Sequence, residues 1–405
     1  MSATAQKTTD KAALTTLFAI VFIDILGYTL VLPLLPFYAE SLGASPFQVG
    51  TIVAVFGLCQ LISGPILGKL SDRFGRKPIL MFSQLGTCLG FILLAQAGSL
   101  PFVFLARILD GITAGNIVVA QAYVADTTTP KERTRAMGII GAAFGLGFIL
   151  GPAITGLLAT FSHSAPIWVA AGLSGVTIVS SQLFLKETVV KAKDAVPVAS
   201  ARARDILKSN HPLVVCLCAY LLFCISFGIF TSGLALFAER VLVWNGRAFV
   251  VREVGYALAI SGFATLITQL LLVGRAVRSI GEYRMACRGF IGLCFGALLC
   301  GVTVYVGPTA LIFLTGMVIH AVSAGFIRPS LNGLMSQTTS PHTQGLVFGL
   351  AQTTLSLSNI FAPLIAGTVI DAGYYSAWSY LAFAFAAGGG TIVLLSKSIP
   401  RGPPQ

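Results

Sequence analysis

The strongest constraint on this fold is a series of apolar stretches, each about 20 residues long, separated by shorter polar segments. A helix of about 20 apolar residues spans the roughly 30 Å hydrocarbon core of a bilayer. The stretches are continuously apolar and lack the alternation of barrel strands, so the sequence predicts spanning helices. We place them at 14–36, 48–69, 79–97, 101–122, 136–160, 166–185, 212–239, 253–274, 285–305, 309–333, 345–370 and 376–396.

Composition also indicates a chain that is solvated mainly by lipid. Of its 405 residues, 56% are hydrophobic and only 10% are charged, whereas soluble domains carry about 25% charged residues. The polar start, Met1 to Ala13, is not followed by a short apolar core with a small-residue cleavage site. We therefore expect a retained first span and an all-α membrane protein with twelve transmembrane helices.

The basic residues predict the orientation. With a cytoplasmic N-terminus, 21 of the 26 Lys and Arg residues fall on the cytoplasmic side and three on the other side. Arg107 and Arg328 lie inside spans. The positive-inside rule therefore predicts that both termini are cytoplasmic. The net charge of +12 is then a topology signal, and we expect no nucleic-acid partner.

The chain divides near its longest polar stretch. We predict an N-terminal six-helix half at 1–185, a cytoplasmic linker at 186–211 and a C-terminal six-helix half at 212–405. The linker is either a solvated tether or a partly helical segment on anionic lipid.

Glycines and prolines recur between the halves at shared offsets. Gly68 and Gly75 recur 206 residues later, as Gly274 and Gly281. Five further positions recur at an offset of 211, namely Thr129, Pro130, Gly138, Pro152 and Gly156, matched by Ser340, Pro341, Gly349, Pro363 and Gly367. The offsets predict two pseudo-symmetric halves of common origin, which enclose a midplane site and rock around it.

The loop after the second span carries a dense motif, Gly-Lys-Leu-Ser-Asp-Arg-Phe-Gly-Arg-Lys-Pro, at residues 68–78. Gly68 permits a close approach and Gly75 permits a turn. The charged side chains Asp72, Arg73 and Arg76 are suited to lock a cytoplasmic gate. The alternative is a plain positive-inside anchor.

This motif resembles the signature of the major facilitator superfamily between helices 2 and 3. The resemblance implies that Asp72 caps the start of helix 11 and that Arg76 pairs with Asp126 at the end of helix 4. A helix N-terminus does attract a carboxylate. It also implies the twelve-helix fold of that family.

A second motif lies in the fifth span. Its spacing is similar to the antiporter motif of the same family, with Thr155 where that motif usually has another glycine. Small residues at this spacing allow close packing and a bend at the proline, and packing alone is the alternative reading. The resemblance implies an exporter. The motif residues are Gly138, Gly147, Gly151, Pro152 and Gly156.

The fourth span contains Arg107-Ile-Leu-Asp110-Gly111. This segment is similar to the family's Arg-x-x-Gln-Gly signature, with Asp110 in place of the glutamine. Together with the residues up to Gly156, it most resembles the tetracycline-efflux branch of drug:proton antiporters.

The chain departs from that branch at three places. Gly90 and Leu293 stand where tetracycline exporters have acidic residues, and Thr265 replaces a histidine. The departures argue against export of a metal–tetracycline complex but leave the transporter class unchanged.

Four charged residues lie well inside spans: Asp24, Arg107, Asp110 and Arg328. A charge at the bilayer centre costs at least about 2.5 kcal/mol, so each needs a partner or a function. One hypothesis is that Asp24 or Asp110 binds a coupling proton and that Arg107 tunes its proton affinity. The alternative is a structural Arg107–Asp110 ion pair, with Asp24 holding its helix to a neighbour.

Polar residues near these charges are candidates for a substrate cavity. Tyr28 lies one turn beyond Asp24, and Gln121 continues the helix face of Asp110. Asn332 lies one turn beyond Arg328. Arg328 either attracts an anionic group of the substrate or pairs with Asp24.

Several classes of function have no motif to support them. The eight cysteines lack zinc-type spacing, no phosphate loop is present and no nucleophile–base pairing is apparent. We read His320, inside the tenth span, as a packed histidine. We therefore expect no enzyme, no metal and no cofactor, with the proton gradient as the energy source.

These observations predict a monomeric multi-pass protein of the bacterial inner membrane that exports small amphiphilic compounds or drugs in exchange for protons. The expected partners are a small-molecule substrate, the proton and the bilayer. Two alternatives stay open: a metabolite uniporter or symporter on the same fold, and a non-transporting receptor or sensor.

Overall fold

The structure is a computed structural model, and it describes residues 11–127, 143, 146–147, 150–162, 164–187, 206–244, 246–307, 310–339 and 344–399. Helices dominate these residues, because a helix pairs its own backbone groups where no water is available. They are α1 (Lys11–Val31), α2 (Leu35–Ser41), α3 (Pro46–Phe74), α4 (Arg76–Ala95), α5 (Leu100–Ile112), α6 (Asn116–Thr127), α8 (Ala165–Phe184), α10 (His211–Val241), α11 (Val251–Ile267), the π-helical η1 (Thr268–Leu272), α12 (Val273–Val306), α13 (Ala310–Gln337), α14 (Gln344–Asp371) and α15 (Tyr375–Leu395). Strands β1 (Val243–Trp244) and β2 (Arg247–Ala248) form a small antiparallel hairpin.

The lengths and apolarity of these helices agree with the predicted membrane fold. In the described part of the chain, nine helices are long and apolar enough to span a bilayer, and α1 with α2, bent by 46°, makes a tenth. One of the nine runs for 56 residues, Val251–Val306, and contains two of the predicted spans. Most of the fifth predicted span, including Gly138, lies outside the described residues.

Two glycines at matching repeat positions break the chain in the same way. Gly75, between α3 and α4, has φ 110°, and Gly281, inside α12, has φ 76°. Glycine adopts this left-handed region without a Cβ penalty. These two glycines, 206 residues apart, therefore form the same kind of turn between consecutive spans.

The fourth span is discontinuous, which differs from the single helix predicted at 101–122. Helix α5 ends at Ile112 and α6 begins at Asn116. The Thr113 hydroxyl donates to the Leu109 carbonyl at 2.8 Å, and the Gly115 amide donates to the Thr113 carbonyl at 2.7 Å. The Thr113 amide keeps its helical bond to Leu109, while the amides of Ala114 and Gly115 depart from the regular ladder.

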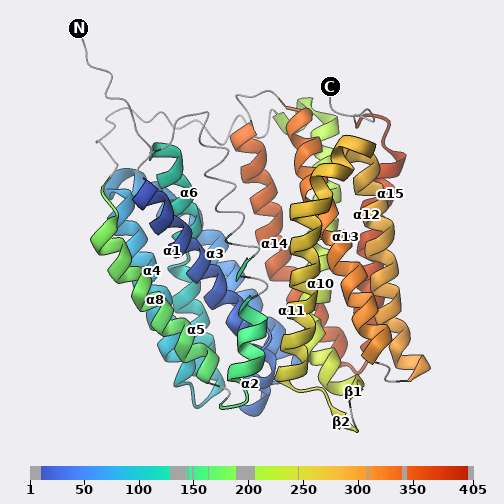
Figure 1. The fold of residues 1–405 in the computed structure, drawn as a ribbon, viewed down its shortest axis with the longest axis horizontal. Coiled ribbons are helices and arrows are strands. Elements are labelled where there is room, and N and C mark those ends of the chain that lie inside the picture. The colour runs from blue at the N-terminus through green and yellow to red at the C-terminus, as the bar shows by residue number, and fades with distance from the viewer. Residues whose placement is uncertain are drawn as a thin grey trace. The chain divides into compact units, whose positions relative to one another are not determined.

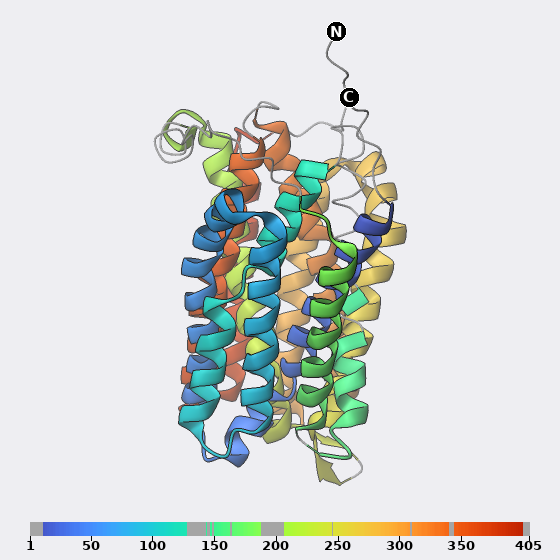
Figure 2. The same cartoon turned by 90° about the vertical axis from the view of Figure 1, so that its left-hand side faces the viewer.

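The chain forms two compact units. The first comprises residues 1–43 and 55–195, and the second comprises residues 44–54 and 196–405. Figures 1 and 2 show the long helices of each unit running side by side, with the first unit coloured blue to green. The predicted limits of the linker stay a prediction, because residues 188–205 are outside the described part.

Each unit has its own apolar core. In the first, Leu17 and Val21 of α1 pack with Leu80 of α4 and Tyr123 of α6. In the second, residues of α10, α12, α13 and α15 pack around Phe290. The first unit therefore brings α1, α4 and α6 together around the residues of the candidate site.

The first turns of α3 belong to the second unit. Gly50 has no room for a Cβ because the backbone of Pro363 in α14 lies against it, and Gly367 meets Pro46 in the same way. The Ser45 hydroxyl also donates to Asp371 Oδ2 at 3.2 Å. Close backbone contact of this kind requires small residues at the crossing.

Candidate functional site

The candidate site begins with Asp24, in the middle of α1. The Asn116 side-chain amide, at the first residue of α6, donates to Asp24 Oδ1 at 2.6 Å. Asn116 is 3% exposed and Asp24 is half-buried. Within the described residues, no Lys, Arg or His nitrogen lies within ion-pair distance of the Asp24 carboxylate.

Asn116 was missed at the sequence level, although a signal was present. Gly115-Asn116 inside an apolar stretch is a break followed by a residue that favours a helix start. The break between α5 and α6 is what presents the Asn116 side chain to α1.

Arg107 and Asp110 meet on one face of α5, as their spacing predicts. Arg107 Nη2 lies 3.2 Å from Asp110 Oδ2, and both side chains are almost completely buried. A Cβ on Gly90 would lie only 3.0 Å from the Asp110 Cβ. The absence of a side chain at Gly90 therefore leaves room for Asp110.

Aromatic rings hold the Arg107 guanidinium on two sides. Its Cζ lies 5.5 Å from the ring centroid of Phe56 and 5.7 Å from that of Phe91. The Tyr28 ring stacks on Phe56, with centroids 6.0 Å apart. Cation–π contacts stabilise a guanidinium without neutralising it. Tyr28 thus joins the same cluster as Arg107.

The described part of the fifth span packs tightly against α1. A Cβ at Gly147 would overlap Ile25, and a Cβ at Gly151 would overlap Thr29. The Thr29 hydroxyl donates to the Gly147 carbonyl at 2.8 Å, and the Thr155 hydroxyl donates to the Leu30 carbonyl at 2.6 Å. Thr155 therefore makes an interhelical bond where the related motif has a glycine. Pro152 and Gly156 are also buried.

A second charged group lies at the junction of α3 and α4. Arg76 Nε donates to Asp126 Oδ2 at 2.8 Å, and Arg76 Nη1 lies 2.6 Å from Asp72 Oδ1 and from Ser71 Oγ. Arg76 is 8% exposed. The Arg76–Asp126 pair that the resemblance implies is thus present, and Asp72 pairs with the same arginine. The helix 11 contact implied for Asp72 would join the two units and stays a prediction.

Glu187 completes this charged group and was not predicted. Its carboxylate accepts hydrogen bonds from the backbone amides of Arg76 at 2.9 Å and Lys77 at 3.2 Å. These amides are unpaired at a helix start, and the helix dipole favours a negative charge there. Glu187 is 111 residues from Arg76 in sequence, so no local pattern could reveal the contact.

Other predicted site residues of the first unit are not part of these clusters. Gln121 is exposed on α6, and Arg73 is exposed, with its guanidinium 5.4 Å from the Phe74 ring centroid. Gly68 lies on α3 against Val118, whose Cγ1 would be 3.4 Å from an added Cβ.

The second unit holds the remaining intramembrane residues. Arg328 and Asn332 are half-buried on α13. Within the described residues, no carboxylate lies within ion-pair distance of Arg328. Its predicted pairing with Asp24 would join the two units and stays a prediction. His320 is buried and stacks on the Phe230 ring at a centroid distance of 3.8 Å.

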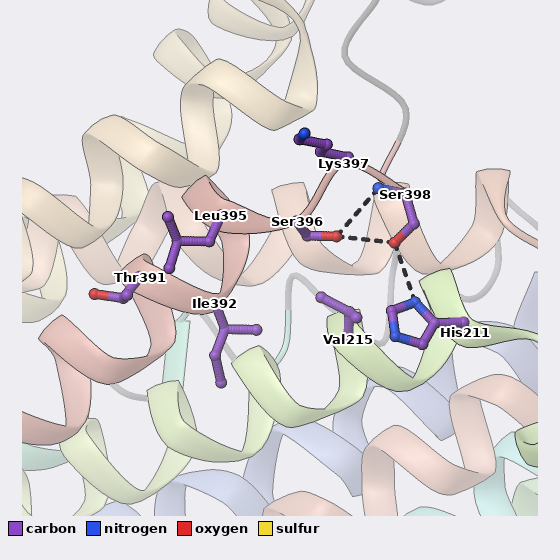
Figure 3. A pocket seen from close by; sticks show the side chains of 8 residues that line it. All are labelled: His211, Val215, Thr391, Ile392, Leu395, Ser396, Lys397 and Ser398. Carbon is purple, nitrogen blue, oxygen red and sulfur yellow. Dashed lines mark hydrogen bonds between the residues drawn. The ribbon is translucent and has the colours of Figure 1, made fainter.

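A hollow of about 470 Å³ lies in the second unit between the start of α10 and the end of α15. Figure 3 shows its lining, where His211 Nδ1 and Ser398 Oγ lie 3.3 Å apart at the rim. None of the predicted site residues lines it.

Comparison with known proteins identifies the family. The model of the Major Facilitator Superfamily matches residues 17–251 and 248–405. The chain belongs to the major facilitator superfamily. This major facilitator chain is 30% identical over 380 residues to Multidrug resistance protein 2 of Bacillus subtilis, covering 91% of this chain and 92% of that protein. It is also 30% identical to the class B tetracycline resistance protein of Escherichia coli, covering 87% of each.

Solved structures agree with the fold of a major facilitator protein. The crystal structure of the human organic anion transporter MFSD10 (TETRAN) matches with a TM-score of 0.70 and 22% identity, over 95% of this chain and 100% of that chain. Nucleoside transporter NupG matches with a TM-score of 0.75 and 14% identity, over 94% of this chain and 97% of that chain. At these identities the likeness concerns the fold alone.

Proposed function

We propose that this major facilitator protein exports small amphiphilic compounds from the cell in exchange for protons, by alternating access of its two halves. Full-length similarity to multidrug and tetracycline resistance proteins supports the substrate class. Its energy source is the proton gradient, and it needs no cofactor. It works as a monomer in the bacterial inner membrane, with both termini in the cytoplasm.

The observation that carries the coupling mechanism is the environment of Asp24. Its one hydrogen-bond partner in the described part of the chain is the neutral amide of Asn116. A carboxylate inside a membrane without a cation partner is costly, and binding a proton removes that charge. Asp24 is therefore the residue that we assign to carry the coupling proton.

The Arg107–Asp110 pair has a different role in this proposal. Asp110 is already balanced by a guanidinium 3.2 Å away, and removing one partner of a buried pair is strongly unfavourable. The pair sets the electric field around Asp24 and holds the polar cluster together. The charged group of Arg76, Asp72 and Asp126 serves as the lock of the cytoplasmic gate.

Proton release from purified protein tests this assignment. Protein in weakly buffered detergent is mixed with ethidium as an amphiphilic probe, and the pH change is followed for wild type, Asp24→Asn and Asp110→Asn. We expect release from wild type and none from Asp24→Asn, which has no proton to give up. Asp110→Asn should still release protons, with a shifted pH dependence.

Binding must be measured in the same samples by ethidium fluorescence. Retained binding in Asp24→Asn with no proton release supports the assignment. Release that is lost in Asp110→Asn and kept in Asp24→Asn would transfer the role to Asp110. Binding without release in wild type would contradict antiport and favour a uniporter.

A further inference from the structure

Several buried polar atoms of the first unit lack a hydrogen-bond partner among the described residues. They lie on side chains around the break between α5 and α6. They are Ser83 Oγ, both amide atoms of Gln84, Asn116 Oδ1, and Arg107 Nε and Nη2, the last of which has only its ion-pair contact with Asp110. Gln84 is only 2% exposed and Ser83 is fully buried.

Contacts along α4 place these atoms along about two turns of that helix. Gly90 of α4 packs against Asp110, Gly86 against Thr113, and Ser83 Oγ would lie 2.9 Å from a Cβ on Gly115. Gln84 follows Ser83 in α4. Its position in the helix therefore places it near the break between α5 and α6.

Buried polar groups are almost always paired, and in an enclosed protein interior their usual further partner is ordered water. A buried amide without any partner is unfavourable. A single water makes two to four hydrogen bonds, so a few waters suffice for all the atoms around this break. An ordinary apolar packing role does not explain a glutamine at this position.

We propose that this region binds a short chain of ordered waters that connects Asp24 to Asp110, with Gln84 and Asn116 as positioning residues. The water site stands on the buried polar atoms alone. Its use as a proton path rests on the proposed antiport function.

The proton step along this chain balances. The O–H bond of protonated Asp24 breaks as its proton passes to the adjoining water oxygen. Each water passes one of its own protons to the next, and the excess proton ends on the water beside the Asp110 carboxylate, which keeps its pair with Arg107. Asp24 becomes a carboxylate and the water chain gains one proton, so the total charge is unchanged. The hydrogen bonds of Asn116 and Gln84 fix the waters at each end.

Among the described residues, few other ionisable groups lie on the helices around the path. Helix α1 contributes Tyr28, and α5 contributes Arg107, which lies against the rings of Phe56 and Phe91. Helices α3 and α4 contribute the half-buried thiols of Cys59 and Cys88. Helix α6 contributes Tyr123, whose hydroxyl donates to the Lys186 carbonyl, and α8 contributes none. In the part of the chain that the structure describes, Asp24, Asp110 and Arg107 are therefore the groups that govern pH dependence here.

Difference infrared spectroscopy tests the water chain directly. Spectra are recorded as ethidium is added to wild type, in ordinary water and in water labelled with ¹⁸O. We expect O–H bands of internal water that shift with the isotope, beside the carboxyl band of Asp24. Gln84→Met should lose those water bands and slow proton release about tenfold, with ethidium binding kept.

Gln182→Met is the matched control, because Gln182 is an exposed glutamine on α8 of the same unit. It should keep both the bands and the rate. Absence of isotope-sensitive water bands in wild type, or their survival in Gln84→Met, would overturn the proposal. If the bands behave as expected but Asp24→Asn still releases protons, the water site stands and the antiport assignment of Asp24 fails.

Discussion

At the residue scale, the central feature is an acid whose partner is an amide. Asn116 donates to Asp24 at 2.6 Å, and this bond favours the charged carboxylate without supplying a compensating charge. An amide also offers an oxygen that accepts a hydrogen bond from a protonated acid. Asn116 is therefore suited to either protonation state of Asp24.

Replacing Asn116 should change the pH at which substrate releases protons. Asn116→Leu removes the donor to the carboxylate, and a hydrogen bond to a charged group contributes about 1.5–3 kcal/mol. We expect the midpoint of ethidium-induced proton release to move upward by about one pH unit or more. Asn116→Ser, which keeps a donor, should shift it less. An unchanged midpoint in Asn116→Leu would exclude a role for this contact.

At the element scale, small residues decide where helices come close. Gly147 and Gly151 let the fifth span contact α1 within two turns of Asp24, and Gly90 makes room on α4 for Asp110. The motif in the fifth span therefore supports the α1 backbone that carries the candidate proton site.

A methyl group at one of these contacts should destabilise the protein. Gly151→Ala would force its Cβ against Thr29, and overpacking of this kind costs about 1–3 kcal/mol. Gly172→Ala on α8 is the control, since no atom lies within 4 Å of its added Cβ. We expect a lower Tm for Gly151→Ala and an unchanged or slightly higher Tm for Gly172→Ala, followed by tryptophan fluorescence in detergent. Equal Tm values would contradict the packing account.

The start of α4 provides a second test at this scale. Glu187→Ala removes the acceptor of two backbone amides, and loss of such a cap costs about 0.5–2 kcal/mol. We expect a lower Tm and faster labelling of a cysteine introduced at Lys77. Glu187→Gln keeps one acceptor oxygen and should lie between Glu187→Ala and wild type. A lower Tm for Glu187→Gln than for Glu187→Ala would contradict this ordering.

At the scale of the whole molecule, hydropathy and charge distribution predicted the membrane fold, because lipid imposes long apolar helices on any chain of this kind. The repeat offset predicted two related halves, and the turns at Gly75 and Gly281 agree with that prediction. The break at 113–115 was not predicted, since Thr, Ala and Gly are compatible with an apolar helix.

The contacts of the candidate site were predictable only where the two contacting residues are close together in the sequence. Arg107 and Asp110 are three residues apart and share a helix face. Asp24 and Asn116 are separated by 92 residues, and their contact depends on how α1 packs beside the broken span. The buried position of Gln84 likewise depends on tertiary packing. A polar residue in an apolar stretch does not by itself indicate which helices its side chain will face.

The most direct test of proton-coupled export is transport in proteoliposomes with an imposed pH gradient. Uptake of ethidium into acidic vesicles is compared with exchange between two equal pools at uniform pH, for wild type and Asp24→Asn. We predict that the gradient drives accumulation by wild type only, while Asp24→Asn still exchanges ethidium. Accumulation by Asp24→Asn equal to that of wild type, or no effect of the gradient on wild type, would contradict the account.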